Sequence, residues 1–199
     1  KKKNWKKFYF KKKKKKNFSN FNFKNYPNFL GVLNLTPDSF SDGGKFTKGN
    51  LGYKHALNLI KFGARAIDVG GESTRPGSKE IKTNIEWNRI NSVIKKLAKK
   101  ITISLDTRKS EIMKKGIKNG VRLINDISGL SDDKKKINIL LKHNTPFVIH
   151  HIQGTPETMQ VKPKYKNVLL DIYDYFEEKI KYLKSIGINH NKIVIDPGI

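Results

Sequence analysis

Residues 101–127 read ITISLDTRKSEIMKKGIKNGVRLINDI, and this stretch decides the fold class. It begins with a short apolar run, 101–107, which is rich in isoleucine and typical of a strand buried on both faces. The amphipathic segment 109–118 has helical spacing, and Gly120 stands where a helix is expected to stop. A second apolar run, 122–127, predicts the next strand. This order indicates a parallel sheet with a right-handed crossover.

The same alternation continues on both sides of this unit. The strands that we expect are residues 29–35, 66–71, 101–107, 122–127, 146–152 and 192–197. Helices are expected between them, at residues 50–62, 83–99, 109–118, 131–142 and 166–185. Four glycines near the ends of these helices are predicted to stop them: Gly63, Gly116, Gly120 and Gly187. The chain is therefore expected to be an α/β protein.

Every expected strand ends in a polar group. These groups are Asn34, the segment 70–75, Asp106, Asn125, His151 and Asp196. In a (β/α)8 TIM barrel such strand ends meet on one face, where active sites are built. A doubly wound open sheet would instead carry a glycine-rich first turn, whereas residues 34–38 read NLTPD. We therefore predict a TIM barrel with about six of its eight βα units, and a sequence cut short of the roughly 250 residues of a complete barrel.

The basic charge of the chain lies largely at one end. The formal net charge of the 199 residues is +25, which first suggests a nucleic-acid binder. Only five of the 42 basic residues are arginine, the residue best suited to bidentate base and phosphate contacts, so we expect no specific nucleic-acid partner. Twelve lysines and no acid lie in residues 1–28, which predicts a disordered basic tail there and a barrel domain in residues 29–199.

Other compositional signals exclude several classes of protein. The sequence has no cysteine, which excludes disulfides, thiolate metal sites and a cysteine nucleophile. No apolar run approaches the roughly 20 residues of a membrane-spanning helix. The basic stretch is not followed by the continuous apolar core of a secretory signal. We expect a cytoplasmic protein without a membrane partner.

Two stretches are too specific to arise by chance: residues 31–44, GVLNLTPDSFSDGG, and residues 68–77, DVGGESTRPG. The shorter patterns LINDI at 123–127 and IDPG at 195–198 accompany them. On these motifs the chain resembles the dihydropteroate synthases, the folate-pathway family that sulfonamides inhibit. The resemblance runs from about residue 28 to the last residue of the sequence.

The resemblance implies the reaction of that family and the cofactor that accompanies it. In this reaction 4-aminobenzoate displaces diphosphate from (7,8-dihydropterin-6-yl)methyl diphosphate, and the product is 7,8-dihydropteroate. Mg²⁺ accompanies the diphosphate, and the diphosphate is pictured as leaving before the amine attacks. The family also implies a homodimer.

The same resemblance assigns roles to individual residues. Asp106, Asn125 and Asp196 match the pterin pocket, and their carboxylate and amide groups suit the ring N–H and amine of a pterin edge. Asn34 matches the residue that the family assigns to Mg²⁺ and diphosphate. Its amide oxygen is a hard, neutral ligand and suits that role. Two loops supply the rest: Asp38, Thr74 and Arg75 as catalytic residues, and Phe40, Thr74, Arg75 and Pro76 as substrate-binding residues.

Two adjacent histidines, His150 and His151, lie in the expected strand 146–152 and should face opposite sides of the sheet. His151 matches the strand-five histidine of the family, whereas His150 stands at a position that is usually apolar. The two rings cannot enter the barrel together as a metal pair. No His-x-His or His-x-x-x-His spacing occurs, so a two-histidine hydrolase site is not expected.

Two other functions stay open. The later segments of the family carry a Ser-Arg-Lys and an Arg-x-His motif for the pterin and the diphosphate, and neither motif occurs in residues 1–199. The chain could therefore be an inactive remnant that binds only pterin or, nonspecifically, polyanions. A pterin-dependent methyltransferase barrel shares the Asp and Asn contacts, but it needs no aminobenzoate site, so residues 31–44 and 68–77 argue against it.

Overall fold

The computed structural model describes residues 28–36, 50–73, 80–130, 134–154 and 163–198. Within these residues, six strands form one sheet: β1 (Phe29–Asn34), β2 (Ala64–Gly70), β3 (Thr102–Asp106), β4 (Leu123–Asp126), β5 (Phe147–His150) and β6 (Ile193–Asp196). The order in the sheet is β1-β2-β3-β4-β5-β6, and every neighbouring pair is parallel. The connecting helices are α1 (Asn50–Lys61), α2 (Thr83–Leu97), α3 (Ser110–Lys118), α4 (Lys134–His143) and α5 (Val168–Ser185). The predicted α/β alternation is confirmed.

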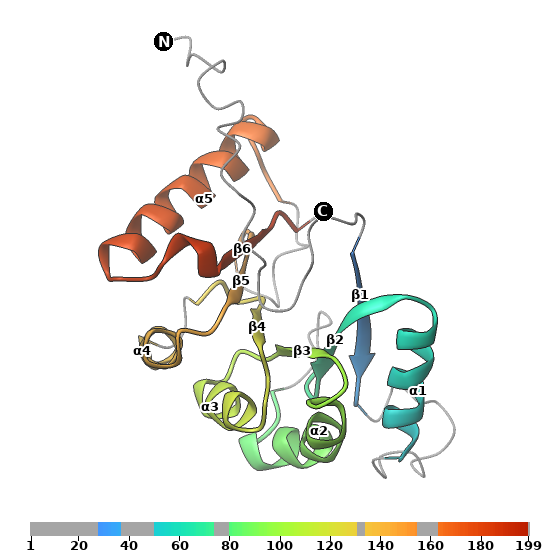
Figure 1. The fold of residues 1–199 in the computed structure, drawn as a ribbon. Helices are drawn as coiled ribbons and strands as arrows, with labels where there is room; N and C mark the ends of the chain where they lie inside the picture. Colours follow the sequence, from blue (N-terminus) through green and yellow to red (C-terminus); the bar gives the residue numbers. More distant parts are fainter. Residues whose placement is uncertain (1–27, 37–49, 74–79, 131–133, 155–162, 199) are drawn as a thin grey trace.

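The helices lie along the outer side of a curved sheet, and the strands form an arc inside them (Figure 1). Strand residues that face the helices, such as Val69 and Leu105, are fully buried together with Ile90 and Ile94 of α2. Burying one such side chain contributes about 1.5–3 kcal/mol to folding. The outer side of the sheet therefore holds the structure together.

The inner side of the arc carries polar groups because side chains alternate along each strand. In β2, Ile67 and Val69 belong to the core under the helices, so Asp68 and Gly70 face inward. In the next strand Asp106 also faces inward, because a side chain at Gly70 would contact its carboxylate. The sheet thus separates a structural outer face from a polar inner face.

Glycines end three of the helices, as predicted. Gly63, Gly120 and Gly187 have φ angles of 101°, 97° and 94°, in the left-handed region that favours glycine after a helix. The prediction is wrong for Gly116, which lies inside α3. A side chain there would collide with Leu105 of β3, so this glycine serves close packing of helix on strand.

The last helix, α5, begins two residues later than predicted because its start is capped. The side chain of Asn167 accepts a hydrogen bond from the N–H of Leu170 at 3.2 Å. Asp171 in turn accepts hydrogen bonds from the N–H groups of Lys166 and Asn167, at 2.9 and 3.3 Å. These bonds satisfy N–H groups that the first turn of a helix leaves unpaired. Residues 131–133, predicted to open α4, lie outside the described residues.

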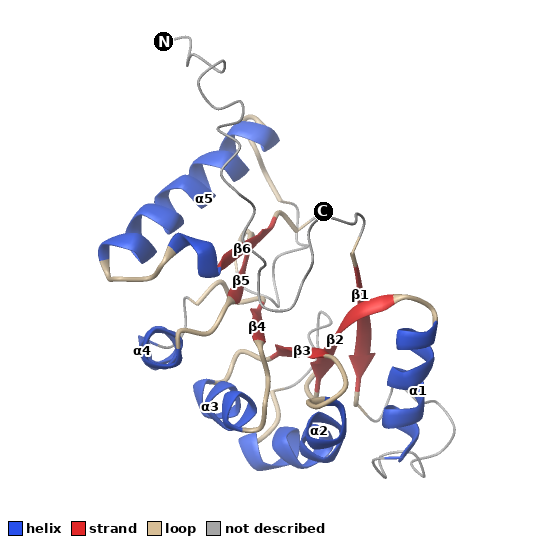
Figure 2. Ribbon diagram, in the orientation of Figure 1, coloured by secondary structure: helices blue, strands red, loops and turns tan. Residues whose placement is uncertain are grey.

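The sheet is open, with β1 and β6 at its two edges (Figure 2). Apolar side chains are exposed at both edges, with Phe29 and Val32 of β1 62% and 57% exposed and Ile195 of β6 52% exposed. Of the expected basic tail, only residue 28 lies within the described residues. In the described part of the chain, no helix is long and apolar enough to cross a bilayer.

Candidate functional site

One row of residues crosses four neighbouring strands at their carboxyl ends. Asn34 of β1 pairs with Gly70 of β2, Gly70 pairs with Asp106 of β3, and Asp106 pairs with Asn125 of β4. Because neighbouring strands are only about 4.8 Å apart, side chains in one register row are in contact range. The structure therefore brings together three of the predicted site residues, Asn34, Asp106 and Asn125.

The glycine in this row lets its two neighbours approach each other. A β-carbon at Gly70 would stand 3.1 Å from Asn34 Oδ1 and 3.4 Å from Asp106 Oδ2. Both oxygens therefore lean over the glycine backbone, where a larger residue would separate them. This close approach places the amide oxygen of Asn34 and the carboxylate of Asp106 on either side of Gly70.

Asp68 is a further member of the site that the sequence analysis did not single out. It stands two residues before Gly70 in β2 and so lies on the same face, one level deeper. Asn125 Nδ2 donates a hydrogen bond to Asp68 Oδ2 at 3.0 Å. The available signal was a carboxylate inside the otherwise apolar run 66–71, where burying a charge is costly unless it is paired.

Several acceptor atoms of the row and of Asp68 have no hydrogen-bond partner. Among the described residues, Asp68 Oδ1, Asp106 Oδ1 and Asn125 Oδ1 are buried and unpaired. Buried polar atoms are nearly always paired, and each unpaired one costs roughly 1–3 kcal/mol. Three unpaired oxygens on one face therefore indicate a place for a ligand that carries N–H donors.

The carboxylates of Asp106, in the row, and Asp68, one level deeper, repel each other in a dry environment. Burial raises the pKa of Asp106 well above its ordinary value, and the nearby charges of Asp68, Asp126, Glu86 and Glu72 raise it further. Burial also raises the pKa of Asp68, although the nearby Ser104 hydroxyl and the hydrogen bond from Asn125 partly oppose this effect. Such shifts are common at functional sites. A donor ligand would stabilise the charged carboxylates.

The third predicted pterin residue, Asp196, lies beside His150 at the far edge of the sheet. The two residues are register partners in β5 and β6, and His150 Nε2 is 3.6 Å from Asp196 Oδ2. The N–H of Gly198 donates to Asp196 Oδ1 at 2.9 Å, which holds the carboxylate against the turn. Asp196 lies outside the row of Asn34 and Asp106 but on the same end of the sheet.

The two histidines face opposite sides, as predicted, but the one beside Asp196 is His150. His151 packs instead among aromatic rings, with ring centroids 5.0 Å from Tyr175 and 6.3 Å from Phe176. Burial lowers the pKa of His151, which favours a neutral ring there. The expectation that His151 forms the polar end of strand five on the common face is therefore corrected to His150.

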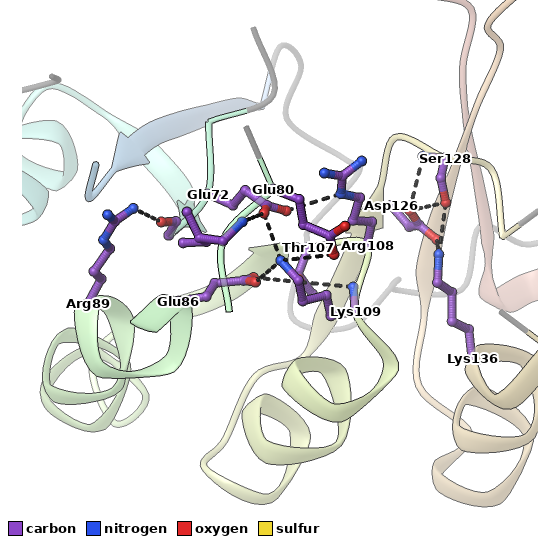
Figure 3. Close-up of polar contacts among 12 residues, drawn as sticks. Glu72, Glu80, Glu86, Arg89, Thr107, Arg108, Lys109, Asp126, Ser128 and Lys136 are labelled. Atoms are coloured by element: carbon purple, nitrogen blue, oxygen red, sulfur yellow. Dashed lines mark hydrogen bonds and ion pairs between the residues drawn. The ribbon is translucent and has the colours of Figure 1, made fainter. Parts of the chain in front are cut away.

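An ion network ties together the segments that follow β2 and β3 (Figure 3). Lys109 Nζ lies between Glu72 Oε1 and Glu86 Oε2, at 2.7 and 3.0 Å. Arg108 Nε contacts the other oxygen of Glu72 at 3.1 Å, and Thr107 Oγ1 donates to Glu86 at 2.6 Å. The sequence analysis did not identify this network, because its members come from three separate segments.

The charges in that network support Glu72 in its ionised form. Burial by itself raises the pKa of Glu72, but the hydrogen bonds from Lys109 and the Ile81 N–H and the charges of Lys109 and Arg108 outweigh it. The pKa of Glu72 therefore lies below its ordinary value. Its carboxylate is charged wherever the pH exceeds this lowered value.

The remaining predicted site residues are Asp38, Phe40, Thr74, Arg75 and Pro76, and they lie outside the described residues. The described chain reaches Thr36 after β1 and Ser73 after β2, directly before these residues. The chain therefore leaves the sheet at the carboxyl ends of β1 and β2, next to the row.

The possible metal ligands of the site suit an ion that a substrate phosphate also holds. In the described part of the chain, no group of three or more His, Asp or Glu residues could hold a metal ion. Asn34 offers a single amide oxygen, at the β1 end of the row. Mg²⁺ is commonly held by one or two protein oxygens together with substrate phosphates. The site fits Mg²⁺ that is delivered with a phosphate ligand, and it does not fit an ion held by these residues alone.

A family match accounts for this arrangement. Residues 30–199 match the family described as pterin binding enzyme, and this range includes the row, Asp68 and all six strands apart from the first residue of β1. The chain belongs to the pterin-binding enzyme family. A pterin carries adjacent N–H donors on one edge of its ring, which is what the unpaired oxygens of the row require.

This pterin-binding enzyme family member is similar to known dihydropteroate synthases. It is 41% identical over 175 residues to the dihydropteroate synthase of Escherichia coli (strain K12), a match that covers 87% of this chain and 62% of that protein. The Yersinia pestis dihydropteroate synthase, solved with a sulfonamide drug complex, has a TM-score of 0.80 at 37% identity and covers 86% of this chain and 63% of that one. The Clostridium difficile dihydropteroate synthase, solved in the presence of pteroic acid, has a TM-score of 0.77 at 38% identity and covers 86% and 64%.

These similarities also confirm the fold class of the chain. The solved neighbours are TIM barrels, and the open six-stranded parallel sheet aligns with part of them. The chain spans about 62% of the length of the curated relative from Escherichia coli. The described residues therefore contain six strands of a (β/α)8 barrel and the five helices that connect them, in line with the predicted incomplete barrel.

Proposed function

We propose that this chain acts as a dihydropteroate synthase in folate biosynthesis. In this reaction the C–O bond between the pterin methylene carbon and the diphosphate breaks, and the diphosphate leaves with the bonding electrons. The amine nitrogen of 4-aminobenzoate forms a C–N bond to the same carbon and loses one proton. The product is 7,8-dihydropteroate. The 41% identity to the Escherichia coli synthase supports this assignment.

One observation carries the proposal, namely the unpaired buried oxygens of Asp68, Asp106 and Asn125. A carboxylate accepts two side-by-side donors, and a pterin edge offers a ring N–H next to an amine. A ligand without these donors would leave the oxygens unpaired, so the row would reject it. We propose that Asp106 and Asn125 bind the pterin edge, with Asp68 behind them and Asp196 closing the pocket at β6.

The two loops outside the described residues complete the proposed site. Thr74 and Arg75 are proposed to bind and activate the diphosphate leaving group, because hydroxyl and guanidinium donors suit phosphate oxygens. Asp38 is proposed as a third catalytic residue. Phe40 and Pro76 are proposed to contact the aminobenzoate. The exits of both loops beside the row support these roles.

Asn34 is proposed to give one oxygen to Mg²⁺ that enters with the diphosphate. When bound, the ion would neutralise part of the charge on the leaving group. The chain's own contribution is orientation, since Asn34 Oδ1 is held over Gly70 beside the carboxylate of Asp106. The diphosphate end of the substrate is thereby directed toward β1 and the pterin edge toward β3 and β4.

Partners and location follow from the same proposal. By similarity to the synthases we propose a cytoplasmic homodimer whose ligands are the pterin diphosphate and 4-aminobenzoate. We propose no specific nucleic-acid or membrane partner, and the scarcity of arginine supports this. Size-exclusion chromatography with light scattering tests the dimer.

Calorimetric titration with 6-hydroxymethyl-7,8-dihydropterin tests the pterin site. We expect Asp106→Ala to weaken binding by about 100-fold or more, because hydrogen bonds to a charged group contribute about 1.5–3 kcal/mol each. Asp174→Ala, on the exposed side of α5, is the matched control and should bind as the wild type does. Equal affinity of Asp106→Ala and wild type would reject the assignment.

Product formation separates the proposal from its alternatives. Dihydropteroate formed from the pterin diphosphate and 4-aminobenzoate supports the synthase. Pterin binding without product formation favours the inactive remnant. Transfer of a methyl group from a methylated pterin favours the methyltransferase.

A further inference from the structure

The carboxylate of Glu72 joins three segments of the chain next to the proposed site. It accepts a hydrogen bond from the N–H of Ile81 at 2.8 Å and from Lys109 Nζ at 2.7 Å on the same oxygen. Its other oxygen contacts Arg108 Nε at 3.1 Å. The Glu72 side chain is only 5% exposed, so these bonds form away from water, where they are strong.

The bond to Ile81 fixes the two ends of one loop relative to each other. Glu72 follows β2 and Ile81 precedes α2, so this single carboxylate closes the segment 73–80 at its base. Arg89 of α2 adds a second fastening, because its Nη1 donates to the carbonyl oxygen of Gly71 at 2.8 Å (Figure 3). The start of the loop is therefore attached to the end of the loop, at Ile81, and to the following helix, at Arg89.

The bonds to Arg108 and Lys109 attach the same base to the segment after β3. Lys109 continues the network to Glu86, a fully buried residue in the first turn of α2. This segment begins directly after Asp106, the proposed pterin ligand. The base of the segment, at Glu72 and Ile81, is thus attached by charge pairs to the residues that follow the proposed pterin carboxylate.

We propose that Glu72 is a positioning residue for the second substrate: it holds the base of the segment 73–80 so that 4-aminobenzoate is aligned with the pterin. The substrate half of this inference rests on the proposed synthase function. In the described part of the chain, Glu72 bonds to Ile81, Arg108 and Lys109 and to no residue of the row, so its proposed role differs from that of Asp106. Small displacements of a substrate-positioning group can cost about 100-fold in rate.

Two variants separate the bonds that Glu72 makes. Glu72→Gln keeps an acceptor for the Ile81 N–H but loses the charge that holds Lys109 and Arg108. Glu72→Ala loses both. Hydrogen exchange at the Ile81 amide measures the bond between Glu72 and Ile81 without any substrate. We expect protection in wild type and in Glu72→Gln, and exchange at least tenfold faster in Glu72→Ala.

Synthase kinetics measure the proposed effect of Glu72 on the positioning of 4-aminobenzoate. We expect KM for 4-aminobenzoate to rise about tenfold in Glu72→Gln and about 100-fold in Glu72→Ala. The calorimetric affinity for 6-hydroxymethyl-7,8-dihydropterin should stay within about twofold of wild type in both, since Asp106 and Asn125 remain. Glu111→Gln is the matched control, because it removes a 2.6 Å ion pair with Lys115 on the exposed side of α3 and should change neither constant.

The results also distinguish this inference from the proposed function. An unchanged KM for 4-aminobenzoate in Glu72→Ala, or an equal loss of pterin affinity, would overturn the positioning role. Unchanged exchange at the Ile81 amide in Glu72→Ala would overturn the fastening itself. If the wild type neither binds pterin nor forms product, the proposed function fails and the substrate half fails with it, whereas slow exchange at Ile81 that depends on Glu72 still supports the fastening.

Discussion

Asn125 Nδ2 donates a hydrogen bond to Asp68 Oδ2 at 3.0 Å, although strand β3 lies between their strands. In a flat sheet, strands separated by one neighbour are about 10 Å apart. The side chains meet because the sheet curls inward, so the curvature of the barrel itself assembles the candidate site. The bond leaves Asp68 Oδ1 and Asn125 Oδ1 facing inward without partners among the described residues.

The first prediction concerns the cost of keeping Asp106 as a carboxylate. Because burial and neighbouring charges raise its pKa in the folded state, Asp106 contributes stability at low pH that is lost as the pH rises through the raised pKa. We expect Asp106→Asn to raise the melting temperature at neutral pH and to weaken pterin binding. Each 1 kcal/mol corresponds to about 2–4 °C for a chain of this size. Calorimetric melting checks this, and a lower melting temperature would contradict it.

The second prediction concerns the pH dependence of pterin affinity. The donors of a pterin favour the ionised form of Asp106, so affinity is highest above its raised pKa. As the pH falls through that value, the carboxyl must release a proton when the ligand binds, and affinity drops. Titrations in two buffers with different ionisation enthalpies measure the released proton.

A matched variant tests the cause of that pH dependence. Asp68→Asn removes the charge that, after burial, contributes most to the shift of Asp106. We therefore expect the fall in affinity to move to lower pH in this variant. A pterin affinity that stays constant over the whole pH range in which the protein is folded would contradict the prediction, because the charge of the carboxyl changes as the pH passes through its raised pKa.

The third prediction compares two glycines on opposite faces of the sheet. A β-carbon in Gly70→Ala would crowd Asn34 Oδ1 at 3.1 Å, so we expect pterin affinity to fall about tenfold with little loss of stability. Gly31→Ala faces α1, where its β-carbon would stand 3.1 Å from Leu59 Cβ, and overpacking there should cost about 1–3 kcal/mol without changing affinity. Titration and urea unfolding of both variants decide whether binding and stability separate in this way.

The fourth prediction concerns the buried ion pair between β4 and α4. Lys136 Nζ lies 3.0 Å from Asp126 Oδ2 and donates to Ser128 Oγ at 2.8 Å, and both charged side chains are fully buried. Lys136→Met leaves a buried carboxylate without its cation, so we expect a loss of about 3–5 kcal/mol in the free energy of unfolding.

An exposed pair gives the control for that measurement. Lys115→Met breaks the pair between Lys115 and Glu111, whose side chains are 39% and 59% exposed, and should cost only about 0.3–0.5 kcal/mol. Urea unfolding measures both changes. Similar losses in Lys136→Met and Lys115→Met would show that burial of the Asp126 pair is not what stabilises it.

Local sequence determined the order and type of the elements. The unit 101–127 predicted a strand, a helix and a strand, and the structure has β3, α3 and β4 there. Polar residues at the ends of strands, such as Asn34 and Asp106, were predictable because the end of an apolar run can be read directly from the chain. Residues close in sequence decide these features, since helix and strand periodicity depend on neighbours a few positions apart.

Only the tertiary structure decided which of these groups meet. Register and curvature bring Asp68 to Asn125 and place His150, rather than His151, beside Asp196. The same holds for Glu72, whose partners Ile81 and Lys109 lie 9 and 37 residues away. Such contacts depend on how a strand pairs with its neighbour and how a helix packs on the sheet. That information is spread over distant segments and has no local pattern.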